Sequence, residues 1–309
     1  KEKKIDLSAG GFALWGGPHI LSLVTEVATR GLKAVRYQKF NNHIRARPEV
    51  LAARIEKADD IEKRYPSLCG CFSDMEAALK EACCEGESGP KDVLTLIRDN
   101  NENASENGGE RTALLPMAFI EGSPMHPAYG AGHATVAGAC VTILKAFFDT
   151  SAIFVKIGDV AGFHTKDQIL QALKKAKEDK KKLSVEAGAY RVVEVEKPKK
   201  GDETYQLDFD PCGSFQLVGE GDKAYLTYKS KKPCCPLTLE DELNKLAANI
   251  SIGRNIGGVH YFTDYYDSLR MGEEIAIGIL EEQALCYKTD PFVLSVPTFD
   301  GKVRRIGAR

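Results

Sequence analysis

The sequence predicts a mainly α-helical protein, a helical bundle that a small β-rich insert interrupts. Apolar residues recur at helical spacing in most of the chain, whereas residues 184–230 contain short alternating stretches such as YRVVEVE and KAYLTYK between turn residues. The chain has 309 residues, 43% of them hydrophobic, which is enough to bury a core. We therefore expect a first part of the bundle at 1–183, the insert at 184–232, and the second part of the bundle at 233–309.

The expected helices have local start signals. Pro18 lies where a first helical turn accepts proline, and a second helix follows Pro48. Thr238 is a candidate N-cap, with Asp241 three residues later. In chain order, we expect helices at 18–39, 49–64, 73–84, 90–99, 132–149, 165–182, 238–255 and 264–287.

Composition excludes several classes of protein. A formal charge of −2 does not favour binding to nucleic acid or to an anionic membrane. No apolar run approaches the roughly 18 residues that a membrane span needs, and the N-terminal KEKKIDLSAGG lacks the apolar segment of a signal peptide. The nine cysteines do not form paired C-x-x-C motifs with histidines, so we expect no zinc site.

Three separated segments place cations and imidazoles at the ends of predicted helices. RYQKFNNHIRARP carries Lys39 and Arg47, and Pro48 keeps Arg47 out of the helical conformation. GAGH places Gly132 and His133 at a helix N-terminus, where free N–H groups attract anions. GRNIGGVHYFTD carries Arg254 and His260. Arginine offers paired N–H donors, lysine a positive charge, and imidazole a ligand nitrogen or a proton, so this set suits a tetrahedral oxyanion. Both phosphate and vanadate would fit.

The same residues carry a resemblance to a known family. Lys39…Arg47-Pro48, then Gly132-His133, then Arg254…His260 resemble the signature that vanadium haloperoxidases share with acid phosphatases. The stretches GGPHILSLVTEVATR, AVRYQKFN, GHATVAGACVTILKAFFD and GEEIAIGILEEQ are similar to red-algal and cyanobacterial vanadium bromoperoxidases. The resemblance covers most of the chain outside about 65–110 and 150–233. It implies the helical-bundle fold of this superfamily and corresponds to the C-terminal half of these longer enzymes.

The resemblance implies a role for each of these residues. His260, in the 233–309 part, would be the metal ligand for vanadate, with Asp264 or a backbone carbonyl orienting its other nitrogen. Lys39, Arg47, Arg254 and the Gly132 N–H would bind the oxyanion. His133 would be the acid–base that takes a proton from hydrogen peroxide, and Lys39 would polarise the bound peroxide. Arg36 and His126 would lie on the halide side of the pocket.

The implied activity is oxidation of bromide or iodide by hydrogen peroxide to hypohalous acid, which halogenates a small organic acceptor. The family has serine where this chain has Ala131, so we expect reduced activity. Two alternatives remain open, an acid phosphatase in which His260 attacks phosphorus and a non-catalytic oxyanion-binding half-subunit. The sequence does not decide the compartment, and the resemblance is compatible with a secreted or cell-surface location.

We further expect association, either as a homo-oligomer or with the N-terminal half of these longer enzymes. The reason is that the segment GEEIAIGILEEQ would otherwise expose an apolar face.

Overall fold

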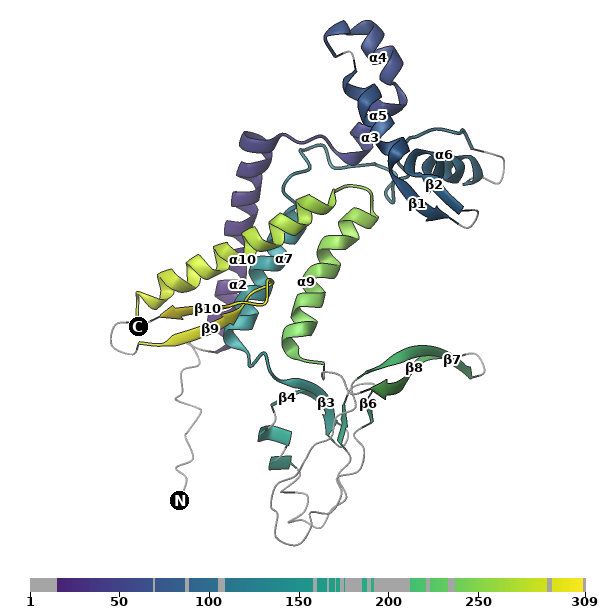
Figure 1. Ribbon diagram of the computed structural model, residues 1–309. Helices are drawn as coiled ribbons and strands as arrows, with labels where there is room; N and C mark the ends of the chain where they lie inside the picture. The colour runs from purple at the N-terminus through teal and green to yellow at the C-terminus, as the bar shows by residue number, and fades with distance from the viewer. Residues whose placement is uncertain are drawn as a thin grey trace. The chain divides into compact units, whose positions relative to one another are not determined.

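The computed structural model is mainly helical, as predicted (Figure 1). It describes residues 16–68, 70–86, 89–104, 109–157, 160–165, 167–169, 171–172, 175, 185–187, 190–191, 212–220, 223–232, 237–287 and 291–307. The helices are α2 (Gly17–Tyr37), the π-helix η2 (Gln38–His43), α3 (Pro48–Glu56), α4 (Ala58–Arg64), the 3-10 helix η3 (Pro66–Leu68), α5 (Cys71–Glu81), α6 (Val93–Asn103), α7 (Gly132–Phe147), α9 (Leu239–Ile256) and α10 (Phe262–Ala284).

The described strands form antiparallel pairs or small sheets. They are β1 (Cys83–Gly86), β2 (Gly89–Asp92), β3 (Ile153–Ile157), β4 (Val160–His164), β5 (Val185–Ala187), β6 (Tyr190–Arg191), β7 (Cys212–Glu220), β8 (Lys223–Lys232), β9 (Val293–Pro297) and β10 (Val303–Gly307). β4, β3, β5 and β6 make a four-stranded sheet in that order, and the other strands form the hairpins β1–β2, β7–β8 and β9–β10.

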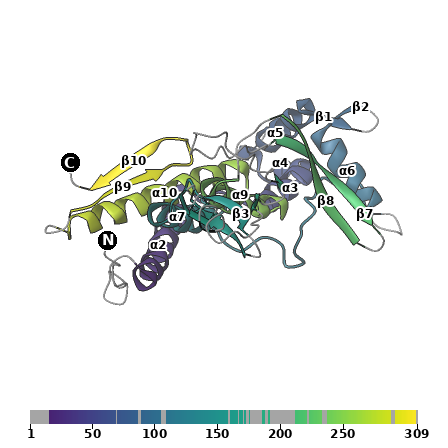
Figure 2. The ribbon, with the colours of Figure 1, turned by 90° about the horizontal axis from the view of Figure 1, so that it is seen from below.

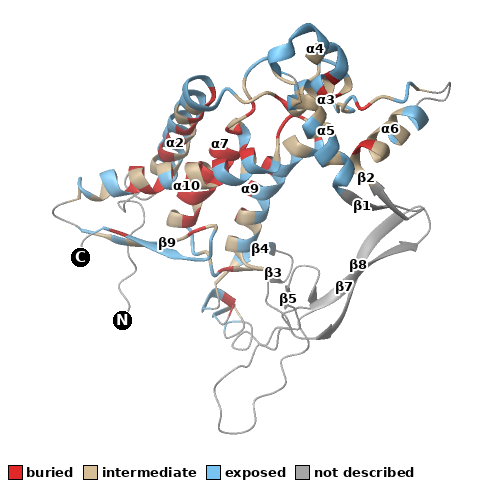
Figure 3. Cartoon of the chain, turned by 45° about the horizontal axis from the view of Figure 1, so that its top comes forward, coloured by how far each residue is buried: buried red, intermediate tan, exposed pale blue. Residues whose placement is uncertain are grey.

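Residues 1–143 and 247–309 form one compact unit, and residues 144–246 form another. The first unit contains α2, α10 and the β9–β10 hairpin, which lies along α10 (Figure 2). Figure 3 shows buried residues gathered on α7 and on the sides of α2 and α10 that face it. In the second unit, the described strands β5 to β8 lie within the predicted insert, whose boundaries stay a prediction.

Glycines let the helices of the first unit pack backbone against backbone. A Cβ on Gly138 of α7 would lie 2.3 Å from the Leu269 carbonyl oxygen of α10, and one on Gly272 of α10 would lie 2.1 Å from the Thr135 carbonyl oxygen of α7. Either contact is far shorter than van der Waals distance, so only glycine permits this crossing. The close packing fixes the start of α7 against α10.

Several predicted boundaries need correction. Residues 49–64 form two helices that meet at Lys57, whose φ and ψ of −109° and 20° interrupt the regular helix. The helix predicted at 90–99 begins only at Val93, because Asp92 caps it by accepting a hydrogen bond from the Thr95 N–H (2.9 Å). Residues 89–92 form strand β2 instead. Most of the helix predicted at 165–182 lies outside the described residues.

Two sequence interpretations of helix ends are confirmed. The Thr238 hydroxyl accepts a hydrogen bond from the Asp241 N–H (3.1 Å), as expected of an N-cap. Arg47 is extended, with φ and ψ of −68° and 154°, immediately before Pro48.

The expectation that the segment GEEIAIGILEEQ exposes an apolar face is wrong. Within this part of α10, Ala276, Ile277, Ile279 and Leu280 are buried in the chain itself. This segment therefore gives no reason for association with another chain. Among the described helices, none is long and apolar enough to cross a membrane.

Candidate functional site

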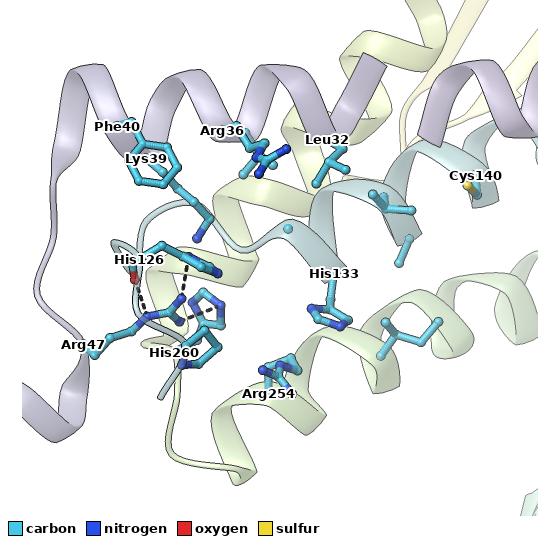
Figure 4. Close-up of a pocket in the computed structure, with 16 residues that line it drawn as sticks. Leu32, Arg36, Lys39, Phe40, Arg47, His126, His133, Cys140, Arg254 and His260 are labelled. Atoms are coloured by element: carbon cyan, nitrogen blue, oxygen red, sulfur yellow. Dashed lines mark hydrogen bonds between the residues drawn. The ribbon is translucent and has the colours of Figure 1, made fainter. Parts of the chain in front are cut away.

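The predicted site residues line one cavity of about 640 Å³ in the first unit (Figure 4). We call five of them the cage: Lys39, Arg47, His133, Arg254 and His260. Arg36, His126 and Gly132 line the same cavity. Because Lys39 belongs to the π-helix at the end of α2, His133 to the start of α7 and Arg254 to the end of α9, three helix ends meet here. Their roles stay predictions.

His260 has a defined orientation. Its ring is buried, and Nδ1 lies 3.0 Å from Oδ2 of the fully buried Asp264. Since the carboxylate can only accept, Nδ1 carries the proton and Nε2 presents a lone pair to the cavity. Arg47 Nη1 donates to this Nε2 at 3.2 Å. Burial lowers the pKa of His260 more than the hydrogen bond to Asp264 raises it, which favours the neutral imidazole that a metal ligand requires.

Asp264 is held on both carboxylate oxygens. Oδ2 also accepts from the Tyr261 N–H (3.0 Å), which caps α10, and Oδ1 accepts from Arg45 Nη1 (2.9 Å). Burial would raise the pKa of Asp264, but the hydrogen bonds from His260 and Tyr261 and the charge of Arg45 hold it below its usual value. Asp264 is therefore an anion that orients His260.

Arg45 is a site residue that the sequence interpretation missed. Its guanidinium also donates to the Thr263 hydroxyl (2.7 Å) and lies 4.2 Å from the centre of the Tyr261 ring. A signal was available, because an extended segment points alternate side chains to the same side, and Arg45 is two residues before Arg47.

Arg47 and Lys39 join separate parts of the chain. Arg47 donates through Nε to the His126 carbonyl (2.8 Å), through Nη1 to the Val259 carbonyl (2.7 Å), and through Nη2 to His126 Nδ1 (2.9 Å). Lys39 Nζ donates to the carbonyls of Pro127 (2.8 Å) and Ala128 (3.1 Å). The two cations thus fix the loop that precedes α7.

Burial, together with uncompensated positive charge, lowers several pKa values in the cavity. Burial, and then the charge of Arg47, lowers the pKa of Lys39 from 10.5 to about 8. Burial followed by the charges of Arg254 and Lys39 lowers the pKa of His133, and burial is also the main cause for His126. An anion in the cavity would relieve this repulsion.

Arg254 supplies an unsatisfied donor. Its guanidinium lies 5.4 Å from the centre of the Phe119 ring, and its buried Nε has no hydrogen-bond partner in the part of the chain that the structure describes. A buried donor without a partner is costly, so this N–H is suited to an oxyanion in the cavity.

The two glycines of the GAGH loop differ in the space around them. A Cβ on Gly130 would lie 2.6 Å from the Ser268 hydroxyl, so Gly130 is required by space. Gly132 has open space around it and is simply the first residue of α7. The neighbouring Ala131 is 1% exposed, and its N–H donates to the Ser268 hydroxyl (2.8 Å). Ala131 is not among the residues that line the cavity.

The chain is similar to enzymes of known class, although no protein-family model matches it. It is 39% identical to a vanadium-dependent bromoperoxidase of Corallina pilulifera and 38% identical to that of Corallina officinalis, each over 310 aligned positions. Each alignment covers 99% of this chain and 40% of the relative. A vanadium-dependent bromoperoxidase of Ascophyllum nodosum is 28% identical over 286 positions, covering 92% of this chain and 37% of that protein.

A solved structure shares the fold. The homohexameric second vanadate-dependent bromoperoxidase of Ascophyllum nodosum matches with a TM-score of 0.53 at 22% identity, covering 96% of this chain and 41% of that chain. The chain spans about two fifths of the length of the curated relatives. Along nearly all of its own length, it is homologous to vanadium-dependent bromoperoxidases and has a helical fold of their type.

Proposed function

We propose that the chain is the vanadate-binding part of a vanadium-dependent bromoperoxidase, which oxidises bromide or iodide with hydrogen peroxide to hypohalous acid. The observation that carries the proposal is the cage, in which a neutral imidazole nitrogen faces a cavity whose other polar groups are mostly cations. The unpartnered Nε of Arg254 supports the fit of an oxyanion such as vanadate. Bound vanadate would supply the electrophilic centre that activates peroxide toward halide.

The residues of the chain would divide the work. His260 Nε2 would bind the metal while Asp264 accepts the hydrogen bond from His260 Nδ1. Arg47 Nη1, which now donates to His260 Nε2, would then donate to an oxygen of the anion. Arg254 and Lys39 would neutralise further oxygens.

The remaining cavity residues would handle the proton and the halide. Because the pKa of His133 is lowered, its imidazole is neutral near pH 7 and can accept a proton from hydrogen peroxide. Arg36 and His126 would attract the halide to the same cavity.

The direct test is halogenation of monochlorodimedone by the purified chain with bromide and peroxide, with and without added vanadate. We expect vanadate-dependent activity that His260→Ala abolishes together with vanadate retention in equilibrium dialysis. Hydrolysis of p-nitrophenyl phosphate without halogenation would favour the acid phosphatase alternative. A folded chain that binds vanadate and shows neither activity would support the non-catalytic half-subunit.

The proposal of reduced activity rests on Ala131, which lacks the hydroxyl of the family's serine. Ala131→Ser should tighten vanadate binding by about ten- to hundred-fold, because one hydrogen bond to a charged group is added. Since Ala131 is buried beside the cavity, the measurement should pair dialysis with urea unfolding. Unchanged affinity at unchanged stability would show that this side chain does not reach the anion.

We also propose association, either with further copies of the chain or with the remaining part of the longer protein. The related solved bromoperoxidase is a homohexamer. Ile120 and Met125 are fully exposed, as large apolar residues at interfaces between chains often are in isolated subunits. Light scattering at micromolar concentration should detect an oligomer, and a monomer would contradict self-association.

A further inference from the structure

A second cavity, of about 1030 Å³, shares Arg47 and His126 with the cavity of the cage. Its walls are one face of α3 and α4, the segment 44–47 and the loop 123–127. The helix residues that line it recur at helical spacing and are Val50, Ala53, Arg54, Lys57 and Ile61. One face of these two helices is therefore open to the second cavity.

Positive charge predominates on the walls of the second cavity. Its cations are Arg45, Arg47, Arg54 and Lys57, and within the described residues Glu49 is its one carboxylate. Glu49 is already engaged, because it accepts a hydrogen bond from the Ser123 N–H (2.6 Å). Arg54 and Lys57 have no ion pair in the part of the chain that the structure describes, although like charges three positions apart on a helix repel each other. An anion in this cavity would relieve that repulsion.

Arg45 and Arg54 both act on the ring of Tyr261. The guanidinium of Arg45 lies 4.2 Å from the centre of this ring. Burial raises the pKa of Tyr261, and the charges of Arg45 and Arg54 lower it, so both cations are within electrostatic reach of the same group. The side chain of Arg45 is 40% exposed, so a ligand in the second cavity can reach it.

Apolar side chains surround these cations. Met125 is fully exposed, and Ile44 and Val50 are 70% and 40% exposed. An inorganic anion would use the cations and leave this apolar surface in water. An amphipathic anion would use both, because its aliphatic chain covers the apolar side chains while its head group accepts charge-assisted hydrogen bonds. The volume of the cavity is sufficient for such a ligand.

We propose that the second cavity binds an amphipathic anion, a carboxylate on an aliphatic chain, and that this ligand weakens the binding of an oxyanion in the cage. The binding step is independent of the proposed function, whereas the effect on vanadate rests on it.

Two contacts connect the second cavity to the cage. Arg45 Nη1 donates to Asp264 Oδ1 (2.9 Å), and Oδ2 of the same carboxylate lies 3.0 Å from His260 Nδ1. A ligand carboxylate that shares Arg45 leaves more uncompensated negative charge on Asp264, next to His260. The ligand also places its own negative charge near Arg47, which lines both cavities. Both effects disfavour a second anion in the cage.

Methyl NMR of methionine detects binding in the second cavity, because Met125 lines it and is not among the residues that line the cavity of the cage. Octanoate is titrated into the full chain, and Met125→Leu assigns the signal. Octanoate should shift the Met125 methyl signal saturably. Acetate lacks the aliphatic chain and 1-octanol lacks the charge, so each should bind at least about tenfold more weakly.

A double substitution tests the cations. Arg54→Gln with Lys57→Gln should weaken octanoate binding at Met125 by about tenfold, because two cations that face the head group are removed. The matched control is Lys63→Gln with Arg64→Gln, since both residues are exposed on α4 and do not line the cavity. This control should leave octanoate binding unchanged.

Equilibrium dialysis of vanadate measures the effect on the cage without requiring turnover. Saturating octanoate should weaken vanadate binding to the wild-type chain by about three- to tenfold. At the same octanoate concentration, the Arg54→Gln, Lys57→Gln variant should show little effect. Because coupling between two sites is reciprocal, saturating vanadate should weaken octanoate binding at Met125 by the same factor.

The outcomes separate the new site from the proposed function. A Met125 signal that octanoate does not shift, or octanoate binding that the double substitution leaves unchanged, overturns the site and leaves the proposed function intact. Equal weakening of vanadate binding in the wild type and the double variant overturns the coupling, because octanoate then competes in the cage directly. A chain that binds neither vanadate nor phosphate rejects the proposed function together with the coupling, and the Met125 titration still decides whether the second cavity binds the anion.

Discussion

Replacing Asp264 by asparagine tests the orientation of His260 without requiring vanadium. The carboxylate accepts three hydrogen bonds, from His260 Nδ1 and the Tyr261 N–H on Oδ2 and from Arg45 on Oδ1. An asparagine amide can accept on one side only. The less costly orientation keeps its oxygen toward His260 and turns its NH₂ group toward Arg45.

The expected cost can be worked out from these contacts. The side chain of Arg45 is 40% exposed, so the loss of its partly solvated ion pair costs only about 1 kcal/mol. The hydrogen bond from His260 changes from charge-assisted to neutral, which costs about 1 kcal/mol more. Asp264→Asn should therefore lower the free energy of unfolding by about 2 kcal/mol. Asp264→Ala should lower it by about 4 kcal/mol, because all three donors lose their acceptor.

Urea unfolding at pH 7 measures the stability, and nitrogen NMR of the histidine ring measures the tautomer. The matched control is Asp267→Asn, because Asp267 is exposed on the same helix and, within the described residues, accepts one hydrogen bond, from the Tyr129 hydroxyl (3.0 Å). It should change the free energy of unfolding by less than about 0.5 kcal/mol. If Asp264→Asn is as stable as this control, and Asp264→Ala keeps the proton on Nδ1 of His260, the proposed orienting role of Asp264 is refuted.

Three further predictions concern the cage and the helix crossing. Arg254→Gln should weaken phosphate or vanadate binding by about ten- to hundred-fold with little loss of stability, whereas comparable binding would exclude Arg254 as a ligand. The unfolding free energy of the anion-free chain should decrease as pH falls below 6.5. Burial lowers the pKa of His126, His133 and His260, so the unfolded state takes up protons first. Saturating phosphate should reduce this dependence of the unfolding free energy on pH, as measured by urea unfolding. An equal dependence with and without phosphate would contradict the lowered histidine pKa values as its cause. Gly272→Ala should destabilise the fold by about 3 kcal/mol in the same assay, because its Cβ would overlap the Thr135 carbonyl. Gly278→Ala in the same helix meets open space and should be neutral or slightly stabilising.

The helices were predictable because their signals are local. Apolar spacing and residues such as Pro18, Pro48 and Thr238 act within one or two turns, so the local sequence is enough to predict where a helix forms. The β9–β10 hairpin was missed although it has a local signal. Asp300-Gly301 is a common turn pair, and Gly301 has the positive φ of 71° that such a turn needs.

The inner contacts of the site were only partly predictable. The sequence brought Asp264 to attention because it lies close to His260 in the same segment, GRNIGGVHYFTD. By contrast, the carbonyls of Pro127, Ala128 and Val259 carry no sequence signal as hydrogen-bond acceptors, since every residue has one. The path of the loop before α7 decides that Lys39 meets Pro127 and Ala128, and the turn between α9 and α10 decides that Arg47 meets Val259.

Lys39 and Arg47 consequently serve the fold and the site with the same atoms. Every nitrogen of the Arg47 guanidinium donates to the His126 or Val259 backbone or to an imidazole, and Lys39 Nζ donates to two carbonyls of the same loop. Neutralising either residue removes structural hydrogen bonds as well as positive charge, so lost activity in such variants cannot be assigned to anion binding alone. Arg254 is different, because its buried Nε has no hydrogen-bond partner within the described residues. Its substitution therefore measures what the anion gains from one guanidinium, and the loop before α7 keeps its contacts.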